Sequence, residues 1–366
     1  MIIHDLIYTH SNPCFPVFLT IISFYINAME RKSESERGME MNETIEWLMS
    51  GPDWVRYNCM RDLFNIGEDN ADVRSARAGM LADSQVQSLI AEVSRWESVP
   101  LKRHNDAIHP LHKLAFLADI GINKHDDGIP EILAKIMNHR ASESPYQVLS
   151  NYPNAFGGSG KDEWLWCLCD APSILYAISK MGLKDDPQVC SAIDYLTAFG
   201  RANGWPCKAD NQLPRFKGPG KAGDPCPYAN LLMLKLLALR GEVKHWQYIQ
   251  PALDSALNLW ESSQERHPYL FKMGNDFRKL KVPYIWYDIL HLAEVISFYP
   301  KYHQDKRFQE ILGIIEGKKD SNGRFTSESI WSKWAGWEFC QKHEPSRWLT
   351  FCVLRILKRV GRWSLR

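Results

Sequence analysis

The sequence predicts an all-α protein, a closed α/α toroid (α6–α6 barrel) built from about six helical hairpin repeats. Three observations favour this fold class: proline-headed apolar segments recur along the chain, amphipathic segments lie between them, and patterns typical of β-strands are weak throughout. The repeated prolines are Pro52, Pro110, Pro172, Pro227, Pro283 and Pro345. Their nearly even spacing indicates one repeated unit that buries its apolar face against its neighbours.

Each proline is expected to open an inner helix. Proline suits the first helical position because its ring fixes φ near the helical value and its missing N–H would be unpaired there anyway. The run after Pro227 is apolar on nearly all sides (231–239), which is typical of a helix buried on two faces. Outer helices are expected where apolar residues recur at helical spacing with polar residues opposite, at 129–137, 189–196, 253–260 and 308–315.

The ring of helices is expected to close rather than remain an open solenoid. Residues 42–51 precede the first inner helix and supply the outer partner that the last inner helix lacks. An open solenoid would instead need polar capping repeats at its ends. The toroid domain is therefore expected to span residues 42–366.

Residues 1–41 are expected to form an N-terminal extension. They contain one apolar stretch, 14–29, which is short for a membrane span and is followed by a charged segment. The extension is either disordered, or in peripheral contact with a membrane, or upstream of a natural start at Met29, Met39 or Met41. Nine cysteines without a secretory-type leader favour reduced thiols and a cytoplasmic location, with membrane association through the apolar stretch as the alternative.

The overall charge disfavours nucleic acid as a partner. The 366-residue chain has 44 lysines and arginines against 43 acidic residues, so its formal net charge at pH 7 is +1. Nucleic-acid-binding domains usually show a basic patch or stripe. A small apolar molecule is the expected partner instead, and the sequence does not identify a protein partner.

Cysteines and acidic residues gather near the starts of the predicted inner helices. If those helices run parallel, their proline-headed ends meet at one rim, and residues distant in sequence come together there. Zinc takes four ligands from thiolate, imidazole and carboxylate groups. The candidate metal ligands are Asp224, Cys226, Cys169, Cys207 and His109. The alternative is that the cysteines are small buried core residues and that Asp224 caps its helix.

With these repeats, the chain resembles the terpenoid cyclase and protein prenyltransferase superfamily of α/α toroids, which includes the squalene cyclases. The resemblance covers about residues 42–361. It includes turns that combine glycine with an aromatic residue, such as "NGWPC" (203–207) and "SNGRF" (321–325).

Two motifs add detail to this resemblance. "GDPCPY" (223–228) looks like the segment by which protein prenyltransferase β subunits hold zinc, which implies Asp224 and Cys226 as ligands and zinc as the cofactor. "LCDAPSILYAI" (168–178) looks like the segment that carries the catalytic acid of oxidosqualene cyclases, which implies Asp170 as the acid. The first motif favours a prenyltransferase and the second favours a cyclase.

The resemblance implies a long apolar, isoprenoid-type substrate in a central cavity, with acid- or zinc-assisted chemistry at the rim. Aromatic faces stabilise a cation, and helix N-termini with basic side chains suit an anionic head group. The expected substrate-binding residues are Trp205, Tyr228, Tyr284, Trp286 and Arg347. Two other functions stay open: a carbohydrate-active α6-barrel enzyme with Asp170 and Asp288 as its carboxylate pair, and a non-catalytic binding toroid.

Overall fold

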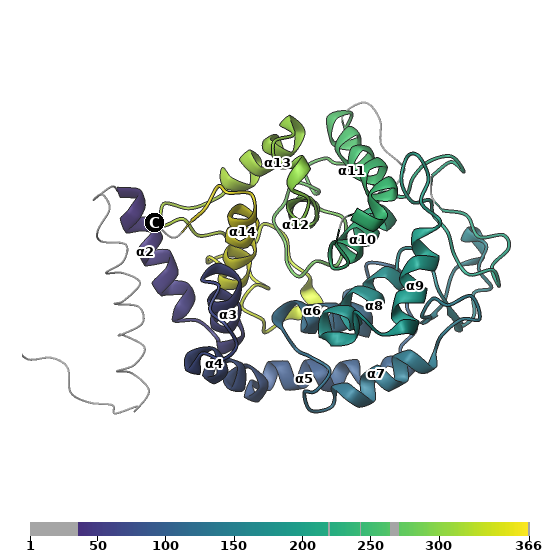
Figure 1. Cartoon of the computed structure of the whole chain (residues 1–366), viewed down its shortest axis with the longest axis horizontal. Helices are drawn as coiled ribbons and strands as arrows, with labels where there is room; N and C mark the ends of the chain where they lie inside the picture. Colours follow the sequence, from purple (N-terminus) through teal and green to yellow (C-terminus); the bar gives the residue numbers. More distant parts are fainter. Residues whose placement is uncertain (1–35, 219, 242, 264–270, 365–366) are drawn as a thin grey trace, which may run out of the picture.

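The protein is seen in a computed structural model, which describes residues 36–218, 220–241, 243–263 and 271–364. In this part of the chain the regular elements are helices and two short strands, which confirms the all-α expectation (Figure 1). No helix there combines the length and the apolar character that crossing a membrane requires. The apolar stretch 14–29, for which membrane contact is one expectation, lies outside the described residues.

One set of helices lies near the middle of the molecule (Figure 1). These helices are α3 (Asp53–Asn58), α6 (Pro110–Ile120), α8 (Ala171–Ile178), α10 (Pro227–Ala238), α12 (Ile289–Ser297) and α14 (Arg347–Arg359). Each contacts the next in this order, and α14 contacts α3. Every residue of α8 and of α12 is buried, as expected for helices that are covered on all sides.

Only two of the six repeated prolines stand at the first helical position. Pro52 is the cap residue of α3, Pro172 is the second residue of α8, and Pro345 precedes the cap of α14. Pro110 and Pro227 are the first residues of α6 and α10, as the sequence predicts. Pro283 does not open a helix, because α12 begins later, at Ile289. The cap of α12 is Asp288, whose carboxylate accepts a backbone N–H of the first turn.

A second set of helices lies nearer the edge of the view in Figure 1. They are α2 (Glu36–Met49), α4 (Ala71–Ala82), α5 (Ser84–Val93), α7 (Ile129–Asn138), α9 (Pro187–Thr197), α11 (Trp246–Glu261) and α13 (Lys306–Glu316). The predicted apolar stripes are buried, for example Ile129, Ile132 and Ile136 in α7. Helix α2 contacts both α3 and α14, the position expected for residues 42–51.

Helices α4 and α5 were not predicted from the sequence. The buried face of α4 consists of Val73, Ala76 and Met80, one medium-sized apolar side chain per turn. A stripe this narrow is a weak signal for an amphipathic helix. Asn70 and Asp83, whose side chains cap α4 and α5, are the local signal that could have identified these helices. Two outer helices therefore lie between α3 and α6.

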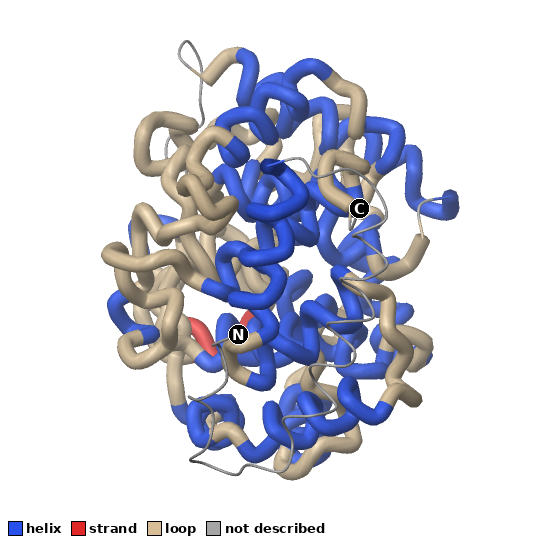
Figure 2. The backbone as a smooth tube through the Cα atoms, turned by 90° about the vertical axis from the view of Figure 1, so that its left-hand side faces the viewer, coloured by secondary structure: helices blue, strands red, loops and turns tan. Residues whose placement is uncertain are grey.

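Loops and short elements connect the helices. Strands β1 (Val148–Ser150) and β2 (Glu163–Leu165) pair antiparallel, with Val148 opposite Leu165. The short helical turns are η1 (Cys59–Leu63), η2 (Trp96–Ser98), η3 (Asn154–Phe156), η4 (Ser179–Leu183), η5 (Val243–His245), η6 (Pro300–Tyr302) and η7 (Ser332–Trp334). Figure 2 shows much of the loop backbone, with the strands among it, toward the left of the view.

An aromatic cluster fills the core between α3, α6 and α14. The ring of Trp54 lies 5.3 Å from those of Trp337 and Trp348, and Phe116 lies 5.1 Å from Trp337 and Trp334. Several of these contacts are edge-to-face, an arrangement that the ring quadrupoles favour. These tryptophans therefore pack in the core.

Buried ion pairs join the C-terminal halves of the central helices. Lys235 of α10 pairs with Asp119 of α6 at 3.4 Å, and Arg355 of α14 pairs with Glu294 of α12 at 2.9 Å. Arg355 also reaches Asp62 of η1 at 3.2 Å. Charged side chains thus lie between the C-terminal halves of these helices. Thiols lie at the N-terminal ends of α8 and α10.

Candidate metal centre

Three thiols from separate segments converge at the N-terminal ends of α8 and α10. Cys169 lies just before α8, Cys226 is the cap residue of α10, and Cys207 comes from the loop between α9 and α10. Their sulfur atoms all lie within 4.8 Å of one another. The Cys169 and Cys226 sulfurs are 3.8 Å apart.

Backbone hydrogen bonds hold the loop that carries Cys207 between the starts of these two helices. On one side, the Cys226 N–H donates to the Trp205 carbonyl (2.8 Å). On the other side, the Leu168 N–H donates to the Lys208 carbonyl (2.9 Å). Because α8 and α10 also pack against each other, the three thiols meet without any two of them being close in sequence.

The spacing of the thiols fits a tetrahedral zinc ion. Two sulfurs that share one zinc at the usual Zn–S distance of about 2.3 Å lie about 3.8 Å apart. The Cys169 and Cys226 sulfurs have this separation. A disulfide would bring them to about 2.05 Å, and both cysteines are free.

A second group of potential ligands shares Cys169. The atoms of His104, Cys167 and Cys169 also lie within 4.8 Å of one another. His104 Nδ1 lies 2.9 Å from Asp170 Oδ1, and the Cys167 thiol donates to Asp170 Oδ2 at 2.8 Å. The Tyr152 hydroxyl donates to the same carboxylate oxygen at 2.8 Å. The carboxylate of Asp170 is therefore the hub of a buried polar cluster.

The charges of these groups shift one another's pKa values. Burial alone would lower the pKa of His104 and raise that of Asp170, but their mutual attraction and the hydrogen bonds within the cluster together outweigh burial in both. The pKa of His104 therefore lies well above its ordinary value and that of Asp170 below it. Hydrogen bonds from Cys169 and Cys207 hold the pKa of the Cys226 thiol well below its usual range, despite burial. The centre thus favours a thiolate and an ion pair.

A cavity of about 510 Å³ opens beside the three thiols. Its wall includes Cys169, Cys207 and Cys226, the basic residues Lys102, Arg103 and Lys217, and the aromatic residues Tyr152, Phe156, Phe216, Phe271 and Trp286. The volume is typical of a pocket for a small molecule. Aromatic and positively charged side chains together suit a ligand with an apolar body and an anionic end.

Three of the predicted metal ligands meet at this centre: Cys169, Cys207 and Cys226. Asp224 and His109 belong to neither group of potential ligands in the described chain. The Asp224 carboxylate accepts the Lys221 N–H at 3.0 Å and lines a neighbouring cavity of about 250 Å³. His109 caps α6: its Nδ1 accepts the Leu111 N–H at 3.1 Å, and its Nε2 lies 2.9 Å from the Val99 carbonyl. Both ring nitrogens of His109 are thus engaged away from the thiols.

The predicted substrate-binding residues separate in a similar way. Trp286 lines the cavity beside the three thiols (the thiol cavity), and the ring of buried Tyr228 lies 4.5 Å from the Trp286 ring. Trp205 is fully buried and donates its indole N–H to a backbone carbonyl. Tyr284 is buried against the ring of a histidine in α12. The Arg347 guanidinium lies 4.7 Å from a tryptophan ring of α2, away from the thiols.

Sequence reasoning did not assign His104 or Tyr152 to the site. Both come from irregular segments that β1 brings together. The Leu101 N–H donates to the Leu149 carbonyl (2.8 Å), and the Asn151 N–H donates to the Leu101 carbonyl (2.9 Å). These two bonds fix the segment that carries His104 beside the end of β1, so that His104 and Tyr152 reach the same carboxylate.

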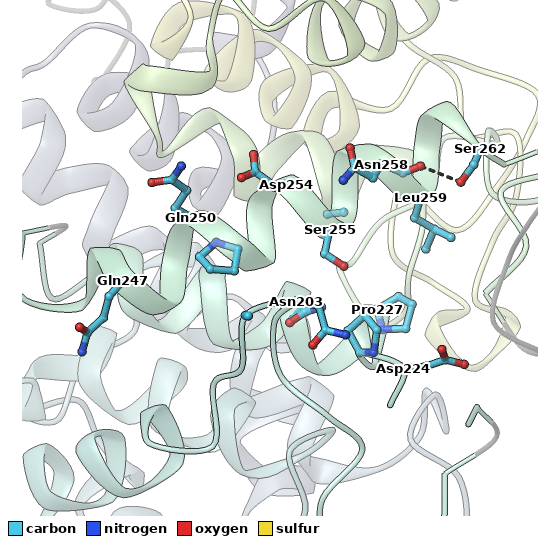
Figure 3. A pocket seen from close by; sticks show the side chains of 15 residues that line it. Asn203, Asp224, Pro227, Gln247, Gln250, Asp254, Ser255, Asn258, Leu259 and Ser262 are labelled. Atoms are coloured by element: carbon cyan, nitrogen blue, oxygen red, sulfur yellow. Dashed lines mark hydrogen bonds between the residues drawn. The ribbon is translucent and has the colours of Figure 1, made fainter. Parts of the chain in front are cut away.

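A second, polar groove of about 510 Å³ runs along α11 (Figure 3). Its wall includes Asn203, Gln247, Gln250, Asp254, Ser255 and Asn258. Some residues of the wall form hydrogen bonds with each other: the hydroxyl of Ser262, also in the wall, donates to the Asn258 carbonyl at 2.8 Å. The groove shares Asp224, Pro225 and Pro227 with the smaller cavity that includes Cys207 and Cys226.

The sequence matches no model of a known protein family, and no curated protein matches it. The described fold and site define the class of protein more broadly: a mostly helical protein with a centre rich in cysteine beside a cavity. The chemistry of that centre follows from its thiol, imidazole and carboxylate groups and from the aromatic and basic wall next to them.

Proposed function

We propose that this chain is a thiolate-zinc enzyme in which Cys169, Cys207 and Cys226 hold a zinc ion beside a substrate cavity. One observation carries the proposal: three thiols from three segments lie within 4.8 Å of one another at the wall of a cavity of about 510 Å³. Catalytic zinc sites usually have three protein ligands and keep a fourth position open. All three thiols line the cavity, so the open position would face it.

The proposed scaffold is a closed α/α toroid. Its inner ring would consist of α3, α6, α8, α10, α12 and α14, and the other long helices would form the outer ring. Contacts between consecutive members of this series, together with the contacts of α14 with α3 and α2, support closure. In such a ring the thiols belong to the rim at which α8 and α10 begin.

The proposed substrate is an apolar, isoprenoid-type molecule with an anionic end. Phe216, Phe271 and Trp286 would pack on its apolar body, and Lys102 and Arg103 would pair with the anionic end. When bound, zinc would lower the pKa of a thiol or water at its open position and so supply a nucleophile. This function corresponds to the prenyltransferase-like version of the resemblance.

In transfer to a thiol, the electrons and atoms balance without an oxidant. A carbon–sulfur bond forms as the carbon–oxygen bond to the anionic leaving group breaks, and the leaving group departs with the bonding electron pair. The thiol proton passes to solvent. The side chains of the cavity would hold the reacting ends together and exclude water from them.

The cyclase version is less well supported. It requires Asp170 as a protonated acid, but the ion pair with His104 holds the pKa of this carboxyl below its ordinary value. The carbohydrate-active version requires Asp170 and Asp288 to face a common cavity. Asp170 instead bonds with His104 and Tyr152, and Asp288 caps α12. A non-catalytic binding toroid remains the outcome if metal binds but no transfer occurs.

Zinc content in matched variants tests the ligand assignment. We expect Asp224→Asn and Cys190→Ser to keep the zinc content of the natural chain, and Cys226→Ser to hold about one zinc ion fewer per chain. If Asp224→Asn lost zinc and Cys226→Ser kept it, the proposed set of ligands would be wrong. A reduced natural chain that takes up no zinc would overturn the proposal as a whole.

Product formation tests the chemistry. The zinc-loaded protein would be incubated with farnesyl diphosphate and a cysteine-containing peptide, and thioether formation followed by mass spectrometry. We expect product from the natural chain and from Cys190→Ser, and none from Cys226→Ser. Folded, zinc-loaded protein that binds the diphosphate without forming product would indicate the binding toroid.

A further inference from the structure

We propose that the centre binds a second divalent ion, zinc as for the first, held by His104, Cys167 and Asp170, with Cys169 as a thiolate shared by the two ions. The inference rests on the proposed function for the first ion and adds a site that neither sequence motif predicts. The two groups of potential ligands in the described chain have Cys169 in common. One sulfur can join them because a thiolate carries more than one lone pair.

The distances in the second group are close to those around one metal ion. Cys167 Sγ lies 4.0 Å from His104 Nδ1 and 2.8 Å from Asp170 Oδ2. His104 Nδ1 lies 2.9 Å from Asp170 Oδ1 and 3.2 Å from Oδ2. A sulfur and a nitrogen or oxygen that share a tetrahedral zinc lie about 3.5 Å apart. Metal entry would replace the protons shared between these groups, and the side chains would shift to the spacing of a tetrahedral shell.

The two sites differ in how complete they are. The second site would have two thiolates, one imidazole and one carboxylate from the protein, which closes a tetrahedral shell. The first site would have three thiolates, with its fourth position on the cavity. His104 lines the cavity together with Cys207 and Cys226, whereas Cys167 is 1% exposed and is not part of the cavity wall. The second ion would thus be structural and would fix the shared Cys169 for the first.

Charge balance permits two ions. With only the first ion, three thiolates exceed its charge by one, while Cys167 remains a thiol and Asp170 remains paired with His104. With both ions, four thiolates and the Asp170 carboxylate carry five negative charges against four positive ones, so the second ion adds no uncompensated charge to the interior. Lys102 and Arg103 at the cavity wall face the remaining charge.

Neighbouring groups already orient the ligands of the second site. The Tyr152 hydroxyl donates to Asp170 Oδ2 at 2.8 Å and to Cys167 Sγ at 3.3 Å. The Cys169 N–H also donates to Cys167 Sγ at 3.3 Å. Outer hydrogen bonds of this kind fix ligand orientation and stabilise thiolate charge in metal sites.

The number of metal ions per chain tests the inference. The full chain would be reduced, reconstituted with excess zinc, freed of unbound metal by gel filtration and measured by elemental analysis. We expect two zinc ions in the natural chain, one each in Cys167→Ser and Cys207→Ser, and fewer than one in Cys169→Ser. Cys190→Ser, a thiol at the start of α9 and outside both groups, should keep two.

The possible results separate this inference from the proposed function. One zinc ion per chain that is lost in Cys207→Ser and kept in Cys167→Ser would overturn the second ion and leave the first intact. No zinc in the natural chain would overturn both. Because a variant can fail to fold, cobalt titration of the metal-stripped natural chain gives an independent count. Its thiolate-to-cobalt absorbance should rise to a break at two equivalents, and a break at one would also overturn the inference.

Discussion

Replacing Arg355 with methionine should destabilise the protein by about 3 kcal/mol. Arg355 is 3% exposed, and its guanidinium reaches Glu294 at 2.9 Å and Asp62 at 3.2 Å. Removing one partner of a buried ion pair leaves the other charge uncompensated, which costs about 3–5 kcal/mol. Glu294 keeps Arg359 at 2.8 Å, so the loss should fall at the lower end of that range.

Urea unfolding measures this loss as a shift of the midpoint at constant slope. The surface control is Lys244→Met, whose pair with Asp194 at 3.2 Å is exposed and worth about 0–1 kcal/mol. The double variant Arg355→Met, Glu294→Met should recover much of the loss, because it leaves less charge buried without a partner. A loss for Arg355→Met no larger than that of the surface control would refute the role of this ion pair.

The same ion pair makes the stability of the protein depend on pH in the acid range. Burial alone would raise the pKa of Glu294, but Arg355 and Arg359 outweigh it and lower the pKa below its ordinary value. A carboxyl whose folded pKa is depressed stabilises the protein above its unfolded pKa, and this stability is lost as pH falls through the folded pKa. The natural chain should therefore lose stability below about pH 4, and Arg355→Met should show a weaker loss.

Three other changes test the site and the core. A Cβ at Gly218 would lie 2.4 Å from Cys207 Sγ, so Gly218→Ala should weaken zinc binding roughly tenfold or more in chelator competition. The control is Gly313→Ala, whose Cβ meets open space. Unchanged zinc binding in Gly218→Ala would contradict the prediction. Tyr152→Phe removes a hydrogen bond to the ligands and should weaken metal affinity about 10–100-fold, whereas natural affinity would argue against a supporting role. Burial raises the pKa of Asp288 to about 7, and a carboxyl with a raised folded pKa loses its stabilising contribution as pH rises toward that value. Stability should fall by about 4 kcal/mol between pH 4 and 7, and Asp288→Asn should flatten this slope; an equal slope in both proteins would exclude this carboxyl as the cause.

The sequence by itself determined most of the helical framework. Apolar spacing of 3.6 residues is a local property, so it identified outer helices such as α7 and α13, and proline placed the starts of α6 and α10. The cap of α10 was predicted wrongly: Asp224 was the capping residue considered, whereas Cys226 directly precedes Pro227 and occupies the cap position. Weak stripes such as that of α4 were missed because one apolar side chain per turn barely exceeds the background.

Only the tertiary structure decided which side chains share the site. His104 and His109 lie five positions apart, and the local pattern favoured His109 because it directly precedes Pro110. His109 caps α6, whereas the pairing of Leu101 with β1 carries His104 to Asp170. The physical reason is that helices form from contacts within a few residues of one another, whereas the centre forms from loops whose paths depend on packing between distant helices.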